Sequence, residues 1–249
     1  MSQVSVVIIT KDEQANIGPC LESARWADEI IVVDSHSADD TAKIAEKYGA
    51  KVLLRRFTNF ADQKNFAIAQ ATKPWIFSLD ADERISEDLK SEIRECIAKQ
   101  DALDGYYVFR NNYVFGRCLR HGGQGRDKQM RLFRAGKARF RNVVHEEVDI
   151  EGSMEILKQR LDHYSYVTLN DYLDKFTQYT DLEVVRMREK GVRFSWMRLF
   201  LVPEVRFIHT YVLKGGFLDG YEGYLFHLLS AVYAFVKYAK LREADKRAG

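Results

Sequence analysis

One short stretch, Trp75 to Glu83, constrains the fold of this chain more than any other. Its first five residues, WIFSL, are mostly apolar, and its last four, DADE, are mostly acidic. A strand that is buried on both faces reads as a continuous apolar run, so this pattern predicts a central parallel strand ending at a functional edge of its sheet. Because residues i and i+2 of an extended chain point to the same side, we expect Asp80 and Asp82 to face one ion together, with Ala81 turned away.

The chemistry of this acidic pair has two interpretations. Carboxylate oxygens suit Mg²⁺ or Mn²⁺, which usually complete their coordination shell with waters and substrate phosphates. Alternatively, the DADE segment caps a helix that begins near Ser86, because acids also favour helix N-termini. The stretch by itself leaves both interpretations open.

The first 80 residues alternate between β-branched apolar runs and amphipathic segments. We predict strands at residues 4–10, 29–34, 51–55 and 75–79, and helices over residues 17–26, 37–48 and 59–71. Ser37 and Asp40 are expected to form a capping box at the start of the second helix. This β-α-β-α-β-α-β order predicts an α/β fold with a mostly parallel sheet and helices on both faces.

Acidic residues follow three of these predicted strands: Asp12 and Glu13, Asp34, and the pair Asp80 and Asp82. In open α/β sheets, ligands bind outside the carboxyl ends of the strands. A single acid at such a position is commonly a solvated cap, but three acidic segments on one sheet edge favour a nucleotide site. No glycine-rich phosphate loop follows the first strand. We therefore expect metal and side chains to hold the diphosphate.

Four ordered segments resemble the successive motifs of the family 2 inverting glycosyltransferases with the GT-A fold. They are residues 6–13 (VVIITKDE), 31–41 (IVVDSHSADDT), 63–67 (QKNFA) and 79–83 (LDADE). The resemblance implies that Asp12 or Glu13 and Asp34 contact the nucleotide. It also implies that Asp80 and Asp82 bind the divalent metal on the diphosphate of the nucleotide sugar. Lys64 and Asn65 match the family's basic-Asn pair and would line the same edge.

The pattern changes after residue 100, as expected for an acceptor-binding part. Strands are predicted at residues 105–115, 129–134 and 138–144, and a basic, glycine-bearing loop at residues 116–127 is either a surface connection or an acceptor-side lid. The segment then reaches His145-Glu146-Glu147. An inverting transfer needs a carboxylate to take the proton of the acceptor hydroxyl. Glu146 is the expected base, because Val-His-Glu recurs in the lipopolysaccharide-core branch of the family.

Alternatives to this base remain open. Glu147 and Asp127 are the next candidates, and the acidic cluster is equally compatible with a solvated strand edge. Further along, His163 lies where GT-A enzymes often carry a late metal or diphosphate ligand, so the resemblance makes it a third expected metal ligand. A lone histidine is more often structural.

The C-terminal third is predicted to be helical. Thr168 and Asp171 form a plausible capping box, and Gly191 is expected to end the helix. Residues 194–203 and 224–238 combine aromatic with basic side chains, which suits either core packing of a helical appendage or a helix lying on an anionic membrane. Residues 224–239 are too few to span a bilayer. We expect membrane contact, strengthened by the last basic residues: Lys237, Lys240, Arg242, Lys246 and Arg247.

Length and composition limit the remaining options. The 249 residues predict a GT-A domain over 1–165, with nucleotide-sugar binding in 1–100 and the acceptor side in 101–165, and a helical region over 166–249. The net charge of +2 gives no reason to expect nucleic acid as a partner. Three widely spaced cysteines and the absence of a signal-peptide pattern predict a cytoplasmic protein.

Residues 215–223 (GGFLDGYEG) also resemble the β-1,4-glucosyltransferases of the lipopolysaccharide core. This resemblance implies UDP-glucose as donor, an inner-core heptose on a lipid A-anchored acceptor, and a peripheral location at the cytoplasmic face of the inner membrane. The segment Gln129–Phe133 departs from the Gln-x-x-Arg-Trp motif of processive members, so one sugar per encounter is expected. The alternatives are transfer to another cell-surface polysaccharide or glycolipid, a nucleotidyltransferase, a receiver-type module and a non-catalytic lipid-binding protein.

Overall fold

The structure of the protein is a computed structural model that describes residues 3–141 and 147–248. The chain forms two compact units. Residues 1–110 and 128–163 form one, called the sheet unit here, and residues 111–127 and 164–249 form the other, called the helical unit. The division predicted at residue 165 differs from this one in placing residues 111–127 with the sheet.

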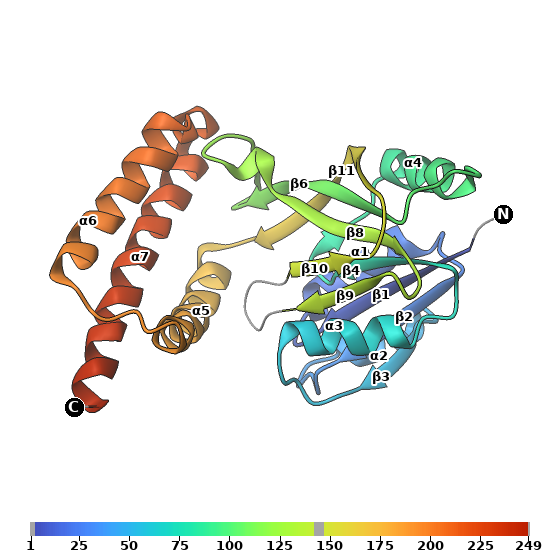
Figure 1. The fold of residues 1–249 in the computed structure, drawn as a ribbon, viewed down its shortest axis with the longest axis horizontal. Coiled ribbons are helices and arrows are strands. Elements are labelled where there is room, and N and C mark those ends of the chain that lie inside the picture. The colour runs from blue at the N-terminus through green and yellow to red at the C-terminus, as the bar shows by residue number, and fades with distance from the viewer. Residues whose placement is uncertain (1–2, 142–146, 249) are drawn as a thin grey trace. The chain divides into compact units, whose positions relative to one another are not determined.

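A nine-stranded mixed sheet is the central element (Figure 1). The first four long strands are parallel in the order β3-β2-β1-β4, as the alternating sequence pattern predicted. Their bounds are β1 (Val4–Thr10), β2 (Glu29–Asp34), β3 (Lys51–Leu54) and β4 (Trp75–Asp80). All of β1 is buried except the partly exposed Ile9, because the sheet is covered on both faces.

Shorter and antiparallel pairings extend this parallel half. β8 pairs antiparallel with β4 and with β6, and β11 pairs antiparallel with the two-residue β5. β7 pairs with β6, and β9 and β10 form a separate hairpin-like pair. The bounds are β5 (Glu83–Arg84), β6 (Gly105–Val114), β7 (Arg117–Leu119), β8 (Lys128–Arg134), β9 (Ala138–Arg141), β10 (Glu147–Ile150) and β11 (Met154–Tyr166).

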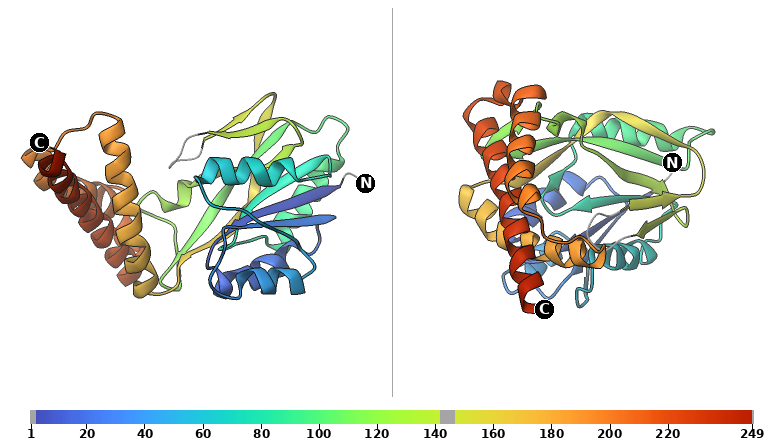
Figure 2. Two further views of the ribbon diagram at one scale, coloured as in Figure 1. Left: turned by 90° about the horizontal axis from the view of Figure 1, so that it is seen from below. Right: turned by 60° about the vertical axis from the view of Figure 1, so that its left-hand side comes forward.

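Helices cover both faces of the sheet, as predicted (Figure 2). Side chains alternate along β1, so Val6 and Ile8 pack with α1 (Gln14–Ala24), α2 (Thr41–Lys47) and α4 (Glu87–Ala98), whereas Val7 packs with α3 (Phe60–Ala69). The buried positions of α4, Leu89, Ile93 and Ile97, recur at helical spacing and complete the first of these cores.

The start of α2 differs from the prediction. The helix begins at Thr41 rather than at Ser37, and the expected capping box is wrong. The reason is that Ser37 is used elsewhere: its hydroxyl and its backbone N–H donate to the two carboxylate oxygens of Asp34, at 2.5 and 2.8 Å. Ser37 therefore closes a turn after β2 instead of starting a helix.

In the helical unit, the capping box predicted for α5 (Leu169–Glu189) is confirmed. Thr168 N–H donates to the Asp171 carboxylate at 2.7 Å, and the Thr168 hydroxyl accepts from Asp171 N–H at 3.2 Å. Gly191 follows the helix at φ +69°, as expected of a glycine that ends one.

The remaining helices of this unit are α6 (Trp196–Phe207), the π-helix η2 (Ile208–Leu213), the 3-10 helices η1 (Gln124–Arg126) and η3 (Gly216–Asp219), and α7 (Gly220–Ala248). The buried Asp219 accepts from the backbone N–H groups of Arg120 and His121, which anchors the basic loop to the helices. Within the described residues, no helix combines the length and the apolar character needed to cross a membrane.

The core beneath α4 generates a stability prediction. Replacement of the fully buried Ile93 by alanine should lower the free energy of unfolding by about 2–5 kcal/mol, because it removes buried methylene groups and leaves a cavity. The matched control is Ile156→Ala on β11, where the isoleucine is 42% exposed and the change should be within about 0.5 kcal/mol. Urea unfolding followed by circular dichroism measures both, and equal losses in the two variants would contradict the assignment.

Candidate functional site

The carboxyl ends of the parallel strands meet at one edge of the sheet, as the sequence predicted. In the strand register, Thr10 of β1 lies beside Asp34 of β2, and Ile9 of β1 lies beside Asp80 of β4. The acids that follow these strands are therefore brought together by the pairing of β1 with both of its neighbours.

The loops after β1 and β2 are bonded to each other. Asp12, at φ +52°, accepts a hydrogen bond from Ala38 N–H at 2.7 Å, and its own N–H donates to the Ser37 hydroxyl at 2.8 Å. Glu13 N–H donates to the Thr41 hydroxyl at 2.9 Å. Of the three residues predicted to contact the nucleotide, Asp12 and Glu13 thus lie in the first of two interlocked loops, and Asp34 ends the strand that leads into the second.

Three buried polar atoms near this edge have no hydrogen-bond partner among the described residues: the Thr10 hydroxyl, the side-chain oxygen of Gln63 and Nε of Arg131. The Gln63 amide nitrogen donates to the hydroxyl of Ser35, directly after β2, at 3.0 Å. Buried polar atoms are normally paired, and leaving them unpaired costs free energy. Such unfilled bonding capacity at the strand ends is what a bound polar ligand would use.

Asp80 is held between two cations. Lys64 Nζ lies 2.9 Å from one of its carboxylate oxygens, and an Arg131 guanidinium nitrogen lies 2.6 Å from the other. Burial opposes ionisation of Asp80, but the charges of Arg131 and Lys64 outweigh it and hold the pKa of this carboxyl well below its usual value. Asp80 is therefore ionised at neutral pH, with both oxygens engaged.

Glu83 completes a buried network with the same arginine. Its fully buried carboxylate accepts from Asp80 N–H at 3.0 Å, from Arg131 at 2.5 Å and from Arg110 at 3.2 Å. Lys64, Arg110 and Arg131 thus contact the carboxylates of Asp80 and Glu83 at the end of β4. Ammonium and guanidinium groups are also the side chains that bind phosphate groups, so this cluster of cations suits an anionic ligand such as a diphosphate.

Asp82 and His163 form a second arrangement at this edge. β5 pairs with β11 so that Glu83 faces His163, which places His163 Nε2 3.5 Å from an Asp82 carboxylate oxygen. Two neighbouring ligands of an octahedral ion with bonds of about 2.1 Å lie roughly 3 Å apart, so this pair fits one Mg²⁺ or Mn²⁺ ion. A strand pairing thus joins two predicted metal ligands that are far apart in the sequence.

The predicted three-ligand set is not gathered, however. Among the residues that the structure describes, no group of three or more His, Cys, Asp or Glu side chains is arranged to hold a metal. Asp80 has its oxygens on Lys64 and Arg131 instead. The helix-capping interpretation of the acidic segment does not account for the geometry either, since Ser86 itself caps α4 by accepting from Leu89 N–H.

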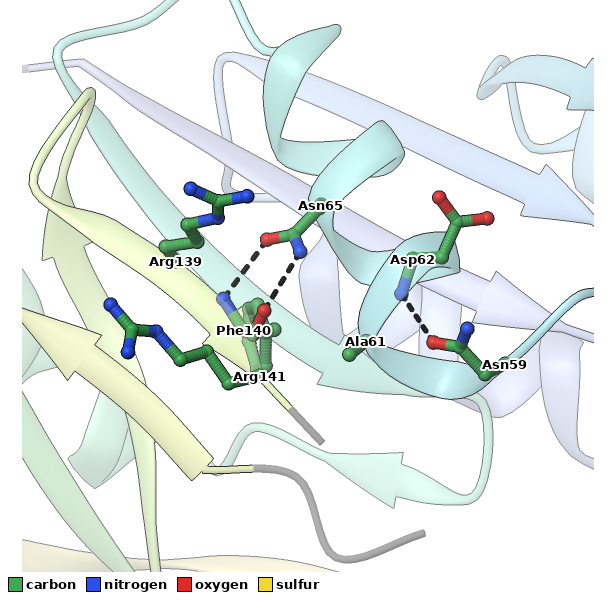
Figure 3. Close-up of a pocket in the computed structure, with 7 residues that line it drawn as sticks. All are labelled: Asn59, Ala61, Asp62, Asn65, Arg139, Phe140 and Arg141. Atoms are coloured by element: carbon green, nitrogen blue, oxygen red, sulfur yellow. Dashed lines mark hydrogen bonds between the residues drawn. The ribbon is translucent and has the colours of Figure 1, made fainter. Parts of the chain in front are cut away.

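Lys64 and Asn65 have different partners although they are adjacent. The Asn65 side chain bonds to both backbone groups of Phe140 on β9, donating at 2.8 Å and accepting at 2.9 Å (Figure 3). A pocket of about 460 Å³ lies between α3 and β9, lined by Asn59, Ala61, Asp62, Asn65, Arg139, Phe140 and Arg141. The structure thus uses Asn65 to hold β9, and its contact with the nucleotide sugar stays a prediction.

The candidate base lies outside the described residues. Nothing is assigned to Glu146, and of Glu147 only the backbone is described, at the start of β10. Asp127, the other alternative, belongs to the helical unit and accepts from the side chain of Asn112 at 3.0 Å. The role of all three stays a prediction.

The sequence reasoning missed the two arginines of the site, Arg110 and Arg131. A signal for Arg131 was present: β8 reads KQMRLFR, and an arginine between Met130 and Leu132 in an apolar strand must find a buried acid. Its 3% exposed side chain finds two.

Comparison with known proteins places the chain in a family. The family model for glycosyl transferase family 2 matches residues 5–163. The lipopolysaccharide core biosynthesis glycosyltransferase LpsC of Rhizobium meliloti (strain 1021) is 30% identical, and the match covers 96% of this chain and 91% of LpsC. An uncharacterized glycosyltransferase of Rickettsia felis is also 30% identical, over 98% of this chain and 91% of its own length.

Among solved structures, glucosyl-3-phosphoglycerate synthase from Mycobacterium tuberculosis with Mn²⁺, UDP and glucosyl-3-phosphoglycerate is 21% identical over 44% of each chain, with a TM-score of 0.39. A likeness at this level does not bear on the ligands of this chain. The match to the family model covers most of the sheet unit, including the interlocked loops and the Asp80 network. The chain belongs to glycosyl transferase family 2 and is a glycosyltransferase with an α/β fold of the GT-A type.

Proposed function

We propose that this glycosyltransferase moves a single sugar, with inversion, from a UDP-sugar to the lipopolysaccharide core. UDP-glucose is the proposed donor and an inner-core heptose the proposed acceptor. The observation that carries the proposal is the sheet edge itself, where Lys64 and Arg131 hold Asp80, and Asp82 lies 3.5 Å from His163 in a pair suited to a divalent metal. The similarity of nearly the whole chain to LpsC, a lipopolysaccharide core biosynthesis glycosyltransferase, supports the acceptor class.

The chain's own residues divide the work of donor binding. Asp12, Glu13 and Asp34 would position the nucleoside, and Lys64, Arg110 and Arg131 would supply positive charge near the diphosphate. Asp82 and His163 would hold a divalent ion, which when bound would neutralise the charge of the departing diphosphate. Asp80 would act by holding Lys64 and Arg131 in place. The hydrogen-bond donors of these two side chains would then be oriented toward the negative charge that develops on the departing diphosphate.

Glu146 is the proposed base, with Glu147 and Asp127 as alternatives. A carboxylate in this role accepts the proton of the acceptor hydroxyl as that oxygen attacks the anomeric carbon. A lipid A-linked acceptor would place the enzyme at the cytoplasmic face of the inner membrane. Another cell-surface polysaccharide or glycolipid remains the alternative acceptor.

Ligand-dependent thermal shifts test the donor. A ligand that binds only the native state at a hundredfold excess over its dissociation constant adds about 2.7 kcal/mol of stability. We expect UDP and one UDP-sugar to raise Tm in the presence of Mn²⁺ and to lose most of that effect in EDTA. An equal rise in Tm with every nucleoside diphosphate would argue against a uridine-specific site. No rise in Tm with any nucleotide would contradict the proposal.

Asp82→Asn tests the metal pair. Removal of the charge at this ligand should lower the transfer rate at least about 100-fold, because a bound metal supplies several kcal/mol of transition-state stabilisation. The Mn²⁺-dependent part of the UDP thermal shift should fall with it. Asp101→Asn, at an exposed position after α4, is the matched control and should leave both unchanged. Full activity in Asp82→Asn would contradict the assigned role.

Arg131→Met tests the buried network. The variant leaves Glu83 without its closest cation, which should cost about 3–5 kcal/mol of stability at pH 7. Arg139→Met, at an exposed position on β9, is the control and should cost less than about 0.5 kcal/mol. Urea unfolding measures both variants.

The pH dependence of this loss gives an independent check. In the wild type the lowered pKa of Asp80 gives stabilisation that is complete above the unfolded-state pKa, about 3.9, and is lost as the pH falls through the lower folded-state value. Without Arg131, only Lys64 and Arg110 offset the burial of Asp80, so the pKa of this carboxyl is higher in the variant than in the wild type. The difference in stability between wild type and Arg131→Met should therefore shrink as the pH falls through the pKa of the variant, and a difference that grows on acidification would contradict the network.

A further inference from the structure

Exposed apolar side chains are concentrated in one segment of the helical unit. Of the 26 large apolar side chains that the described residues expose, 15 lie between Trp196 and Phe235. The most exposed are Leu213 at 74%, Tyr221 at 70% and Met197 at 66%. Monomeric proteins rarely expose so many large apolar side chains close together, and such a concentration marks an interaction site.

The apolar side chains of α6 fall on two different sides of the helix. Leu199 and Pro203 are buried, and α6 lies alongside α7 (Figure 1). A second set recurs at spacings of three and four residues and is at least half exposed. This set, the α6 stripe, consists of Met197, Leu201, Val205, Ile208 and Val212. The helical period therefore gives α6 one apolar side for packing and another that faces outward, and Ile208 and Val212 of η2 continue the outward side.

An aromatic row continues this surface toward α7 and η3. The rings of Phe207 and Tyr211 stack at 5.0 Å, and Tyr211 contacts Tyr224 of α7 at 5.6 Å and Phe217 of η3 at 6.3 Å. The exposed Leu218 and Tyr221 lie beside this row in the chain. The exposed apolar residues therefore extend over four elements of the helical unit, α6, η2, η3 and α7.

The flanking charges have one predominant sign. Residues 193–214 hold four basic side chains and one acidic side chain, Glu204, and Arg193, Arg198 and Lys214 are exposed. On α7, Lys240 pairs with Asp181 at 2.7 Å, and Arg242 lies over the Trp196 ring at 4.3 Å. Arg193, Arg198 and Lys214 therefore place exposed positive charge at both ends of the α6–η2 segment and within α6.

We propose that the α6 stripe and the aromatic row form a docking surface for an anionic lipid bilayer. Apolar side chains would enter the boundary of the acyl chains, aromatic rings would lie at the headgroup level, and Arg193, Arg198 and Lys214 would meet anionic headgroups. A second copy of the chain fits less well, because a two-fold contact through this face would bring like charges together. The inference rests on the proposed function, because the enzyme would reach a lipid-linked acceptor at the surface of the bilayer.

Vesicle co-sedimentation tests the surface without donor or acceptor, so its result is separable from glycosyl transfer. We expect the full-length protein to sediment with vesicles of phosphatidylcholine and phosphatidylglycerol, and to do so less as salt screens the charges. Leu201→Gln with Val205→Gln should lower the partition coefficient about tenfold or more, because binding scales with buried apolar area. The matched control is Leu54→Gln with Ile156→Gln, two exposed apolar residues of the sheet unit, which should bind as the wild type does.

A second double variant, Arg193→Gln with Arg198→Gln, changes only exposed charges. It tests the surface even if the first double variant fails to fold. It should weaken binding to phosphatidylglycerol vesicles and remove most of the salt dependence, with an unchanged circular dichroism spectrum. Wild-type binding by the folded Leu201→Gln, Val205→Gln variant would overturn the proposal. A second result would also overturn it: the wild type does not bind anionic vesicles but is a dimer by light scattering, and the Leu201→Gln, Val205→Gln variant is a monomer.

Discussion

The candidate site depends on one buried ionic interaction, the contact of Arg131 with both Asp80 and Glu83. Arg131 is 3% exposed and the Glu83 side chain is fully buried, so neither charge is hydrated and each requires the other. The same arginine joins β8 to the end of β4, and Glu83 also accepts from the backbone of Asp80. Loss of the arginine would therefore disturb the orientation of the whole acidic segment, including Asp82.

This interaction also explains why two acids of one motif have different surroundings. Asp80 ends β4 and points to Lys64 and Arg131, whereas Asp82 lies beyond the strand and comes within 3.5 Å of His163. Alternation along an extended strand would place both on one side, but the strand ends at Asp80 and a turn follows. The motif thus separates into a structural carboxylate that fixes cations and a carboxylate that remains suited to a metal.

The sequence predicted the parts of the fold that local patterns determine. The four parallel strands, the helices on both faces, the Ser86 start of α4 and the capping box of α5 follow from apolar periodicity and from side chains within three residues of each other. The strand β11, the two-residue β5 and the start of α2 did not follow. Each is determined by partners distant in the chain, as when Ser37 bonds to Asp34 and Asp12 rather than capping a helix. His163 entered the candidate site through resemblance, and its proximity to Asp82 depends on a pairing between segments about 80 residues apart.

The two units place different physical demands on the same chain. At the edge of the sheet, the proposed binding of a diphosphate requires charges that are buried, paired and held in fixed orientations. The free-energy cost of orienting them is then met when the protein folds, before the ligand binds. In the helical unit, the α6 stripe leaves apolar side chains uncovered and keeps Arg193 and Arg198 in solvent, an arrangement that lowers free energy only when a partner covers it. The proposed donor, a sugar nucleotide, comes from water, and the proposed lipid-linked acceptor comes from a bilayer. An enzyme that joins them needs one surface suited to each, and these two surfaces have those opposite characters.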